Sequence, residues 1–145
     1  MAEAIARHAL DQGQVPGVEG DVMVVSAGLA AGDGAPYSDE TLEALERLGI
    51  ALDGSSKRAS AEMIRKADVV LCMTEGHVRQ AQRLLGDDER AKAHVQPLDP
   101  EGDVDDPIGR GPEAYHALAK RFRKMIPRRL ADALVQRAAP RTGAP

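Results

Sequence analysis

Three short apolar segments alternate with segments of helical period along this chain, and this alternation limits its possible folds more than any other feature. The strand-like segments are residues 21–25 (DVMVV), 68–73 (DVVLCM) and 95–98 (VQPL). Valine and leucine dominate them, as they do in short buried strands. Strands separated by helices pair in parallel through helical crossovers. The pattern therefore predicts a three-layer α/β domain, with a central parallel sheet flanked by helices.

Capping residues predict where the inner helices begin and end. Ser38, Ser60 and Thr74 each stand directly before a segment that is rich in helix formers. A side-chain oxygen at that position can accept a hydrogen bond from the first turn of the helix. Gly49 and Gly86 close the first and the last of these segments. We therefore expect three helices in these places, the second of them short.

The two ends of the domain are also predicted to be helical. Residues 2–12 (AEAIARHALDQ) are mostly helix formers, and Gly13 follows them. Pro112 suits the first turn of a final helix, which Pro127 is expected to kink or restart. The chain thus opens with a helix, whereas an α/β fold of this kind usually opens with a central strand.

Length and composition indicate one globular domain. The chain has 145 residues, of which 43% are hydrophobic and 29% charged. We expect the domain to cover residues 1–137 and the low-complexity end, residues 138–145, to be a disordered tail. No apolar run reaches the length of a membrane span, and the first residues do not resemble a signal peptide. These features predict a cytoplasmic protein.

The sequence shows no sign of a metal site or another cofactor site. Cys72 is the single cysteine, which excludes an internal disulfide and a multi-cysteine zinc site. The histidines lie far apart and show no metal-ligand spacing: His8, His77, His94 and His116. The net charge of −4 argues against nucleic acid or an anionic membrane as a partner. We therefore expect no cofactor and no metal.

One basic cluster near the C-terminus departs from the acidic balance. Its members are Lys120, Arg121, Arg123, Lys124, Arg128 and Arg129. A nucleic-acid-binding patch is one interpretation, but no aromatic platform accompanies the cluster. The interpretation that we favour is the solvated face of an amphipathic helix.

Four motifs, in order, resemble the low-molecular-weight protein tyrosine phosphatase family, in its bacterial branch. Residues 1–4 (MAEA) resemble the segment after the family's phosphate-binding loop, and residues 26–28 (SAG) its Ser-Ala-Gly after the second strand. Residues 68–77 (DVVLCMTEGH) are similar to a strand and helix start further along, and residues 106–109 (DPIG) to its Asp-Pro general-acid loop. The resemblance covers essentially residues 1–126 and implies a metal-independent phosphatase acting on a phosphorylated protein.

The resemblance also implies a Cys-x5-Arg loop directly before the Met-Ala-Glu segment. In the family the thiolate of that loop attacks phosphorus, and the arginine holds the phosphoryl oxygens. Here Met1 occupies the place of the family's internal methionine. The resemblance therefore implies a sheet of about four strands whose first, central strand is absent, and a truncated chain that is inactive as written. If this chain folds, we expect an exposed apolar groove in the sheet and a tendency to aggregate.

Asp106 is the candidate general acid and base. The resemblance assigns it the protonation of the leaving group and then the activation of water. Pro107 restricts it to extended geometry, which suits a carboxylate that projects from a loop. A simple acidic turn is the alternative, because Asp103 and Asp105 lie beside it among glycines. Asp105 is the second choice for the acid.

Two further residues take roles from the resemblance. Ser26 matches the serine whose hydroxyl supports the phosphate loop, although a strand-end serine that caps local backbone would look the same. Ile108 occupies the rim of the substrate pocket, where many relatives carry an aromatic residue that stacks on phosphotyrosine. A branch of the family that dephosphorylates arginine shares the glycine-rich form of this loop. Phosphotyrosine and phosphoarginine therefore both stay open as substrates.

Cys72 and Arg79 do not replace the family's catalytic pair. Six residues separate them rather than five, and Glu75 between them would repel phosphate. Cys72 lies within an apolar strand segment, where a small buried thiol is expected. We therefore assign no nucleophile in this chain.

Two other functions stay open. A pseudophosphatase would keep the scaffold as a binding module without catalysis. An arsenate reductase on the same scaffold ranks lower, because its usual relay needs several cysteines and this chain has Cys72 alone.

Overall fold

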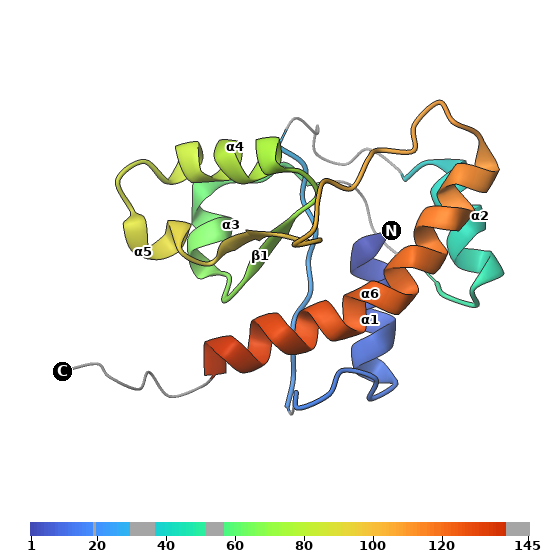
Figure 1. Cartoon of the computed structure of the whole chain (residues 1–145), viewed down its shortest axis with the longest axis horizontal. Coiled ribbons are helices and arrows are strands. Elements are labelled where there is room, and N and C mark those ends of the chain that lie inside the picture. The colour runs from blue at the N-terminus through green and yellow to red at the C-terminus, as the bar shows by residue number, and fades with distance from the viewer. Residues whose placement is uncertain (19, 30–36, 52–56, 139–145) are drawn as a thin grey trace.

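The structure is a computed structural model that describes residues 1–18, 20–29, 37–51 and 57–138, except the side chains of 136–138. Figure 1 shows the chain with its elements, which are α1 (Ala2–Asp11), α2 (Asp39–Arg47), α3 (Ala61–Lys66), β1 (Val70–Cys72), α4 (Glu75–Leu85), α5 (Glu89–Lys92), β2 (Val95–Pro97) and α6 (Pro112–Ala138). Apart from Ala138, the predicted tail lies outside the described residues.

Side-chain caps begin four of the helices. The three predicted caps, Ser38, Ser60 and Thr74, each accept a hydrogen bond from the backbone amide three residues ahead, at 3.3, 3.2 and 3.1 Å. Asp88 accepts the same bond at 3.0 Å and begins α5, a short helix that was not predicted. A cap of this kind stabilises a helix by about 1 kcal/mol. The predicted starts of α2, α3 and α4 are therefore confirmed.

β1 and β2 form a parallel two-stranded sheet. Val70 pairs with Val95 and Cys72 pairs with Pro97. α4 and α5 make the crossover between the two strands, and α4 also packs against α3. This sheet and its helices enclose a small core of Ile64, Cys72, Val78, Ala81, Leu85, Ala91 and Val95. Two of the predicted strands, within residues 68–73 and 95–98, are thus confirmed, and they pair in parallel as a sheet of this class requires.

The larger core lies where α6 packs against α1 and α2 (Figure 1). Ile5, Leu45 and Phe122, one from each of these helices, are its most deeply buried large side chains. Leu98 and Val104, which follow β2, belong to the same core. The chain between β2 and α6 is therefore anchored in the larger core as well as on the sheet.

The prediction of a strand at residues 21–25 is wrong. The segment is extended, but it pairs with no other strand of the described residues. The carbonyl oxygen of Val24 instead accepts two hydrogen bonds from the Arg7 guanidinium, at 2.7 and 3.0 Å. Further along, a single parallel bridge joins Gly28 to Arg58. A strand needs a neighbouring strand whose backbone it can pair with. The apolar composition of residues 21–25 was therefore not enough to make them part of the sheet.

Pro127 was predicted to kink or restart the final helix. α6 is one helix through Pro127, so the helix does not restart there, and the kink stays a prediction. Proline inside a helix removes a backbone donor and costs about 3 kcal/mol. Ile126 is 2% exposed, and Leu130 also packs against the larger core. This packing on both sides of the proline holds the helix together. Neither α6 nor any other helix of the described residues is long and apolar enough to cross a membrane.

The predicted basic cluster lies along α6 and is mostly solvated. Its exposed members are Lys120, Arg121, Arg123, Lys124 and Arg128. Arg129 differs, because it is half-buried and donates hydrogen bonds to the end of β2. Arg121 is exposed but forms an ion pair with Asp99. The cluster is therefore a mostly solvated helix face in which Arg121 and Arg129 also contact the chain around the end of β2.

Candidate acid–base site

The loop between β2 and α6 carries the candidate general acid, and its root is fixed to the sheet. The Leu98 amide donates to the carbonyl oxygen of Cys72 at 2.7 Å, and the Val104 amide donates to that of Met73 at 2.8 Å. The Val104 side chain is only 3% exposed. Figure 1 shows the chain arching from β2 to the start of α6. Asp106 follows two residues after this anchored position.

Asp106 is exposed and shapes its own turn. Its Oδ1 accepts a hydrogen bond from the Ile108 amide at 3.0 Å, and the Arg110 amide donates to the carbonyl oxygen of Pro107 at 3.0 Å. Gly109 has φ +76°, a conformation that favours glycine. Within the described part of the chain, no other hydrogen bond or ion pair reaches this carboxylate. One oxygen therefore closes the turn, and the other has no hydrogen-bond or ion-pair partner among the described residues.

Three neighbouring aspartates of the loop, Asp103, Asp105 and Asp106, look alike in sequence but have three different surroundings. Asp103 Oδ1 accepts a hydrogen bond from the Glu75 amide at 2.9 Å, at the start of α4. Asp106 closes its turn, and Asp105 is exposed between them. The bond of Asp103 was not predicted, because its partner lies 28 residues away and no local pattern marks the pair.

Ser26 and Ile108, the other two predicted site residues, are both exposed. Ser26 follows the extended segment, and its hydroxyl makes no hydrogen bond with any residue that the structure describes. Ile108 is 72% exposed, next to the turn that Asp106 closes. No hydrogen bond among the described residues joins Ser26 to the Asp106 loop. The phosphate-loop role of Ser26 and the pocket-rim role of Ile108 therefore stay predictions.

Cys72 is free and buried at the end of β1, as predicted. Burial raises the pKa of its thiol to about 11. A thiol with that pKa holds very little thiolate at neutral pH, and the thiolate is the nucleophile. Arg79 is exposed on α4. The burial and the raised pKa thus argue against Cys72 as a nucleophile, and the absence of a nucleophile from these residues stays a prediction.

The histidines do not form a metal site in the described structure. No group of three or more His, Cys, Asp or Glu side chains is placed to hold a metal ion among the residues described. His94 is buried, and its Nε2 lies 2.9 Å from the carbonyl oxygen of Ile64. His77 is exposed, and its backbone amide donates to Thr74.

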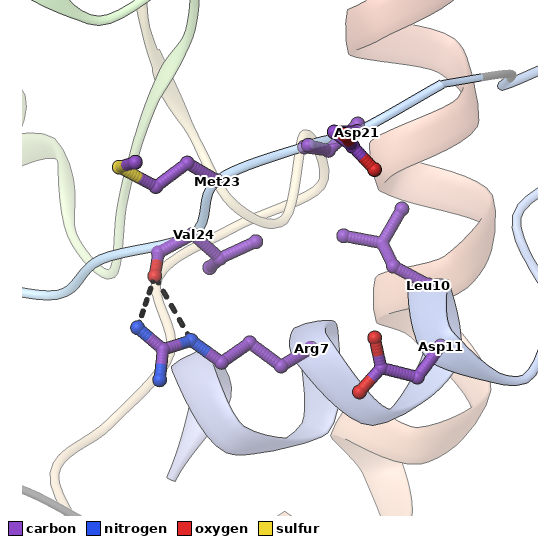
Figure 2. A pocket seen from close by; sticks show the side chains of 7 residues that line it. Arg7, Leu10, Asp11, Asp21, Met23 and Val24 are labelled. Carbon is purple, nitrogen blue, oxygen red and sulfur yellow. Dashed lines mark hydrogen bonds between the residues drawn. The ribbon is translucent and has the colours of Figure 1, made fainter.

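An open hollow lies between α1 and the extended segment, away from the predicted site residues. Figure 2 shows Arg7, Leu10 and Asp11 of α1 facing residues 21–24 across it. The Arg7 guanidinium is already engaged by the Val24 carbonyl oxygen. None of Asp106, Ile108 and Ser26 lines the hollow. It is therefore not part of the acid–base site.

Comparison with known proteins identifies a family. Residues 1–139 match the model of the low molecular weight phosphotyrosine protein phosphatase family. No curated protein sequence matches the chain.

Three solved structures resemble the chain over most of its length. The YwlE arginine phosphatase from Geobacillus stearothermophilus is 31% identical, with a TM-score of 0.71 over 93% of this chain and 83% of that one. A low molecular weight protein tyrosine phosphatase from Bacillus subtilis is 28% identical, with a TM-score of 0.77 over 93% and 87%. A YwlE arginine phosphatase solved as a cysteine-to-serine mutant with a phosphorylated active-site serine is 28% identical, with a TM-score of 0.79 over 93% and 86%.

Proposed function

Because this chain belongs to the low molecular weight phosphotyrosine protein phosphatase family, we propose that the protein removes phosphate from phosphorylated proteins through a cysteinyl-phosphate intermediate. The surroundings of Asp106 are the observation that carries the proposal. This residue lies within the matched range, and its loop is fixed to the sheet at Val104. Its carboxylate is exposed, with one oxygen free of partners among the described residues.

The reaction takes place in two steps with water as the co-reactant. A cysteine thiolate attacks phosphorus, the bond from phosphorus to the substrate oxygen or nitrogen breaks, and Asp106 gives that atom its proton. Water then attacks the phosphocysteine, Asp106 takes a proton from the water, and the thiolate leaves as inorganic phosphate forms. The relative with a phosphorylated active-site serine supports a phosphoenzyme of this kind.

The nucleophile is not Cys72 in this proposal. Cys72 is the single cysteine of the 145 residues, and its thiol is buried with a pKa of about 11. We therefore place the nucleophilic cysteine and the arginine that binds phosphate outside these residues. The protein would act in the cytoplasm, where an unpaired cysteine stays reduced.

The proposed substrate is a phosphoprotein, and two phosphorylated side chains are candidates for the residue that is hydrolysed. Ile108 offers an exposed aliphatic surface beside the turn of Asp106, which an aromatic ring or an arginine side chain could contact. Relatives that are 28% and 31% identical are a tyrosine phosphatase and an arginine phosphatase. We therefore propose phosphotyrosine and phosphoarginine as the two candidate substrates, and both are to be assayed.

A pseudophosphatase is the second candidate. The observation that favours it is that the one cysteine of these residues is buried with a raised pKa. The intact mass of the protein from the cells that make it separates the two candidates. A mass above 15.4 kDa by about one strand and one loop, together with activity, supports the phosphatase. A mass that matches 15.4 kDa, with no activity on either substrate, supports the pseudophosphatase.

A matched pair of substitutions tests the role of Asp106. Both are made in the protein of native mass, either purified from the cells that make it or expressed at that full length. Asp106→Asn should lower kcat by about 100-fold or more on phosphotyrosyl and phosphoarginyl peptides, because the loss of a general acid costs that much. Asp105→Asn removes the same charge one residue earlier and should leave kcat within about twofold. Equal kcat values in the two variants would show that Asp106 is not the acid.

A further inference from the structure

Asp103 and Thr74 both accept hydrogen bonds from the first turn of α4, but only one of them belongs to that helix. Thr74 Oγ1 accepts from the His77 amide at 3.1 Å and is the helix's own N-cap. Asp103 Oδ1 accepts from the Glu75 amide at 2.9 Å and comes from the loop after β2. A carboxylate in this position also interacts favourably with the partial positive charge of the helix start. The bond therefore joins the acidic loop to α4.

The hydrogen bond between Asp103 and the Glu75 amide, which we call the Asp103 tie, lies directly before the anchored residue of the loop, Val104. Val104, the next residue, donates its amide to the Met73 carbonyl oxygen at 2.8 Å and buries its side chain. Asp106 follows after one exposed residue, Asp105. Without the hydrogen bond of Asp103, the Val104 amide and side chain alone would hold this side of the loop's root, and Asp106 follows only two residues later.

We propose that Asp103 is a positioning residue, which holds the root of the Asp106 loop on the start of α4. The proposal rests on the proposed function, because Asp106 is the group that Asp103 positions. Asp103 touches no substrate in this role. It acts through Val104 and the short segment that follows.

A purely structural role for Asp103 makes a different prediction. If the carboxylate only capped α4, then the loss of either cap would have the same consequences for the molecule. Thr74→Ala is therefore the matched control, because it removes the helix's own cap and leaves the loop contact in place. Asp103→Asn is the conservative variant, because its side-chain oxygen can still accept from the Glu75 amide.

Amide hydrogen exchange on the 145-residue chain tests the tie without any need for activity. In Asp103→Ala, the amides of Val104 and Ile108 should exchange about five- to tenfold faster than in Thr74→Ala, because local opening of the root is added to the loss of a cap. Asp103→Asn should restore most of the protection. Equal exchange at Val104 and Ile108 in Asp103→Ala and Thr74→Ala overturns the inference.

The active protein adds a kinetic readout that separates this inference from the proposed function. A general acid matters most for a poor leaving group, and both substrates share the later hydrolysis of the phosphocysteine. The ratio of kcat/KM for phenyl phosphate to kcat/KM for p-nitrophenyl phosphate therefore reports on the placement of the acid. Asp103→Ala should lower this ratio about tenfold, and Thr74→Ala should leave it unchanged. A lowered ratio in Asp106→Asn with an unchanged ratio in Asp103→Ala overturns the inference alone. An unchanged ratio in Asp106→Asn overturns the proposed function, and the exchange measurement still decides whether the tie exists.

Discussion

Arg129 of α6 donates a 3.0 Å hydrogen bond to the carbonyl oxygen of Leu98, just after β2. The same guanidinium donates to the carbonyl oxygen of Pro97 at 3.0 Å and to the side chain of Gln96 at 2.8 Å. One half-buried side chain thus satisfies three acceptors where β2 passes into the acidic loop. The last helix is therefore tied to the sheet at the place where the loop of Asp106 begins.

We expect Arg129→Ala to lower the free energy of unfolding by about 2 kcal/mol, because it leaves three acceptors without their charged donor. Arg128→Ala is the control, because Arg128 is exposed and makes no hydrogen bond or ion pair with the described residues. Its effect should stay within about 0.5 kcal/mol. Urea unfolding followed by circular dichroism measures both values. Equal losses of unfolding free energy in the two variants would mean that the hydrogen bonds of Arg129 contribute nothing to stability.

Cys72 should be protected from alkylation in the folded protein. Its pKa of about 11 makes the thiolate scarce at pH 8, whereas the thiol of an unfolded chain has an ordinary pKa. Iodoacetamide should therefore react about 100-fold more slowly with the native chain than with the chain in urea. Mass spectrometry of timed samples measures the two rates. Rapid labelling of the native chain would contradict the burial of this thiol.

The same thiol should make the folded state less stable at high pH. The folded pKa is raised above its ordinary value of 9.0, so the folded state holds the proton more tightly than the unfolded state. The contribution of Cys72 is therefore fully present below pH 9 and is lost as the pH rises towards 11. Comparison of unfolding curves for the protein and Cys72→Ala at pH 8 and pH 10.5 isolates this contribution from other groups that titrate there. A difference between the two proteins that does not change with pH would contradict it.

We expect the extended segment to promote self-association. Met23 and Val25 are 89% and 51% exposed, and their segment has no strand partner among the described residues. An unpaired extended segment with exposed apolar side chains is a template for pairing with another chain. The pair of substitutions Met23→Lys and Val25→Lys should reduce association in sedimentation velocity at increasing concentration.

The control for self-association uses apolar residues on helices. Leu42 and Leu84 are 41% and 44% exposed, on α2 and α4. Leu42→Lys with Leu84→Lys adds the same charge without changing the extended segment. If this pair reduces association as much as the first pair does, then added charge and not the segment is responsible.

The candidate site was predictable only where its signal lies in neighbouring residues. Asp106 followed from the short motif 106–109, and the turn that it closes spans the same residues. One oxygen of its carboxylate accepts the hydrogen bond that closes the turn, and its catalytic role stays a prediction. Asp103 could not be told apart from Asp105 in the sequence, because the amide that distinguishes it belongs to Glu75.

The sequence by itself determined the helix starts and the burial of Cys72. Ser38, Ser60 and Thr74 find their partners three residues ahead, so the interaction is complete within a single turn. Only the tertiary structure decided which apolar segments became strands. The strand within residues 68–73 pairs in parallel with the strand after the α4 crossover. In residues 21–25 the Val24 carbonyl oxygen instead accepts hydrogen bonds from the Arg7 guanidinium. A strand, like the bond of Asp103, takes its partner from a distant part of the chain, and only the packing of the elements brings that partner within reach.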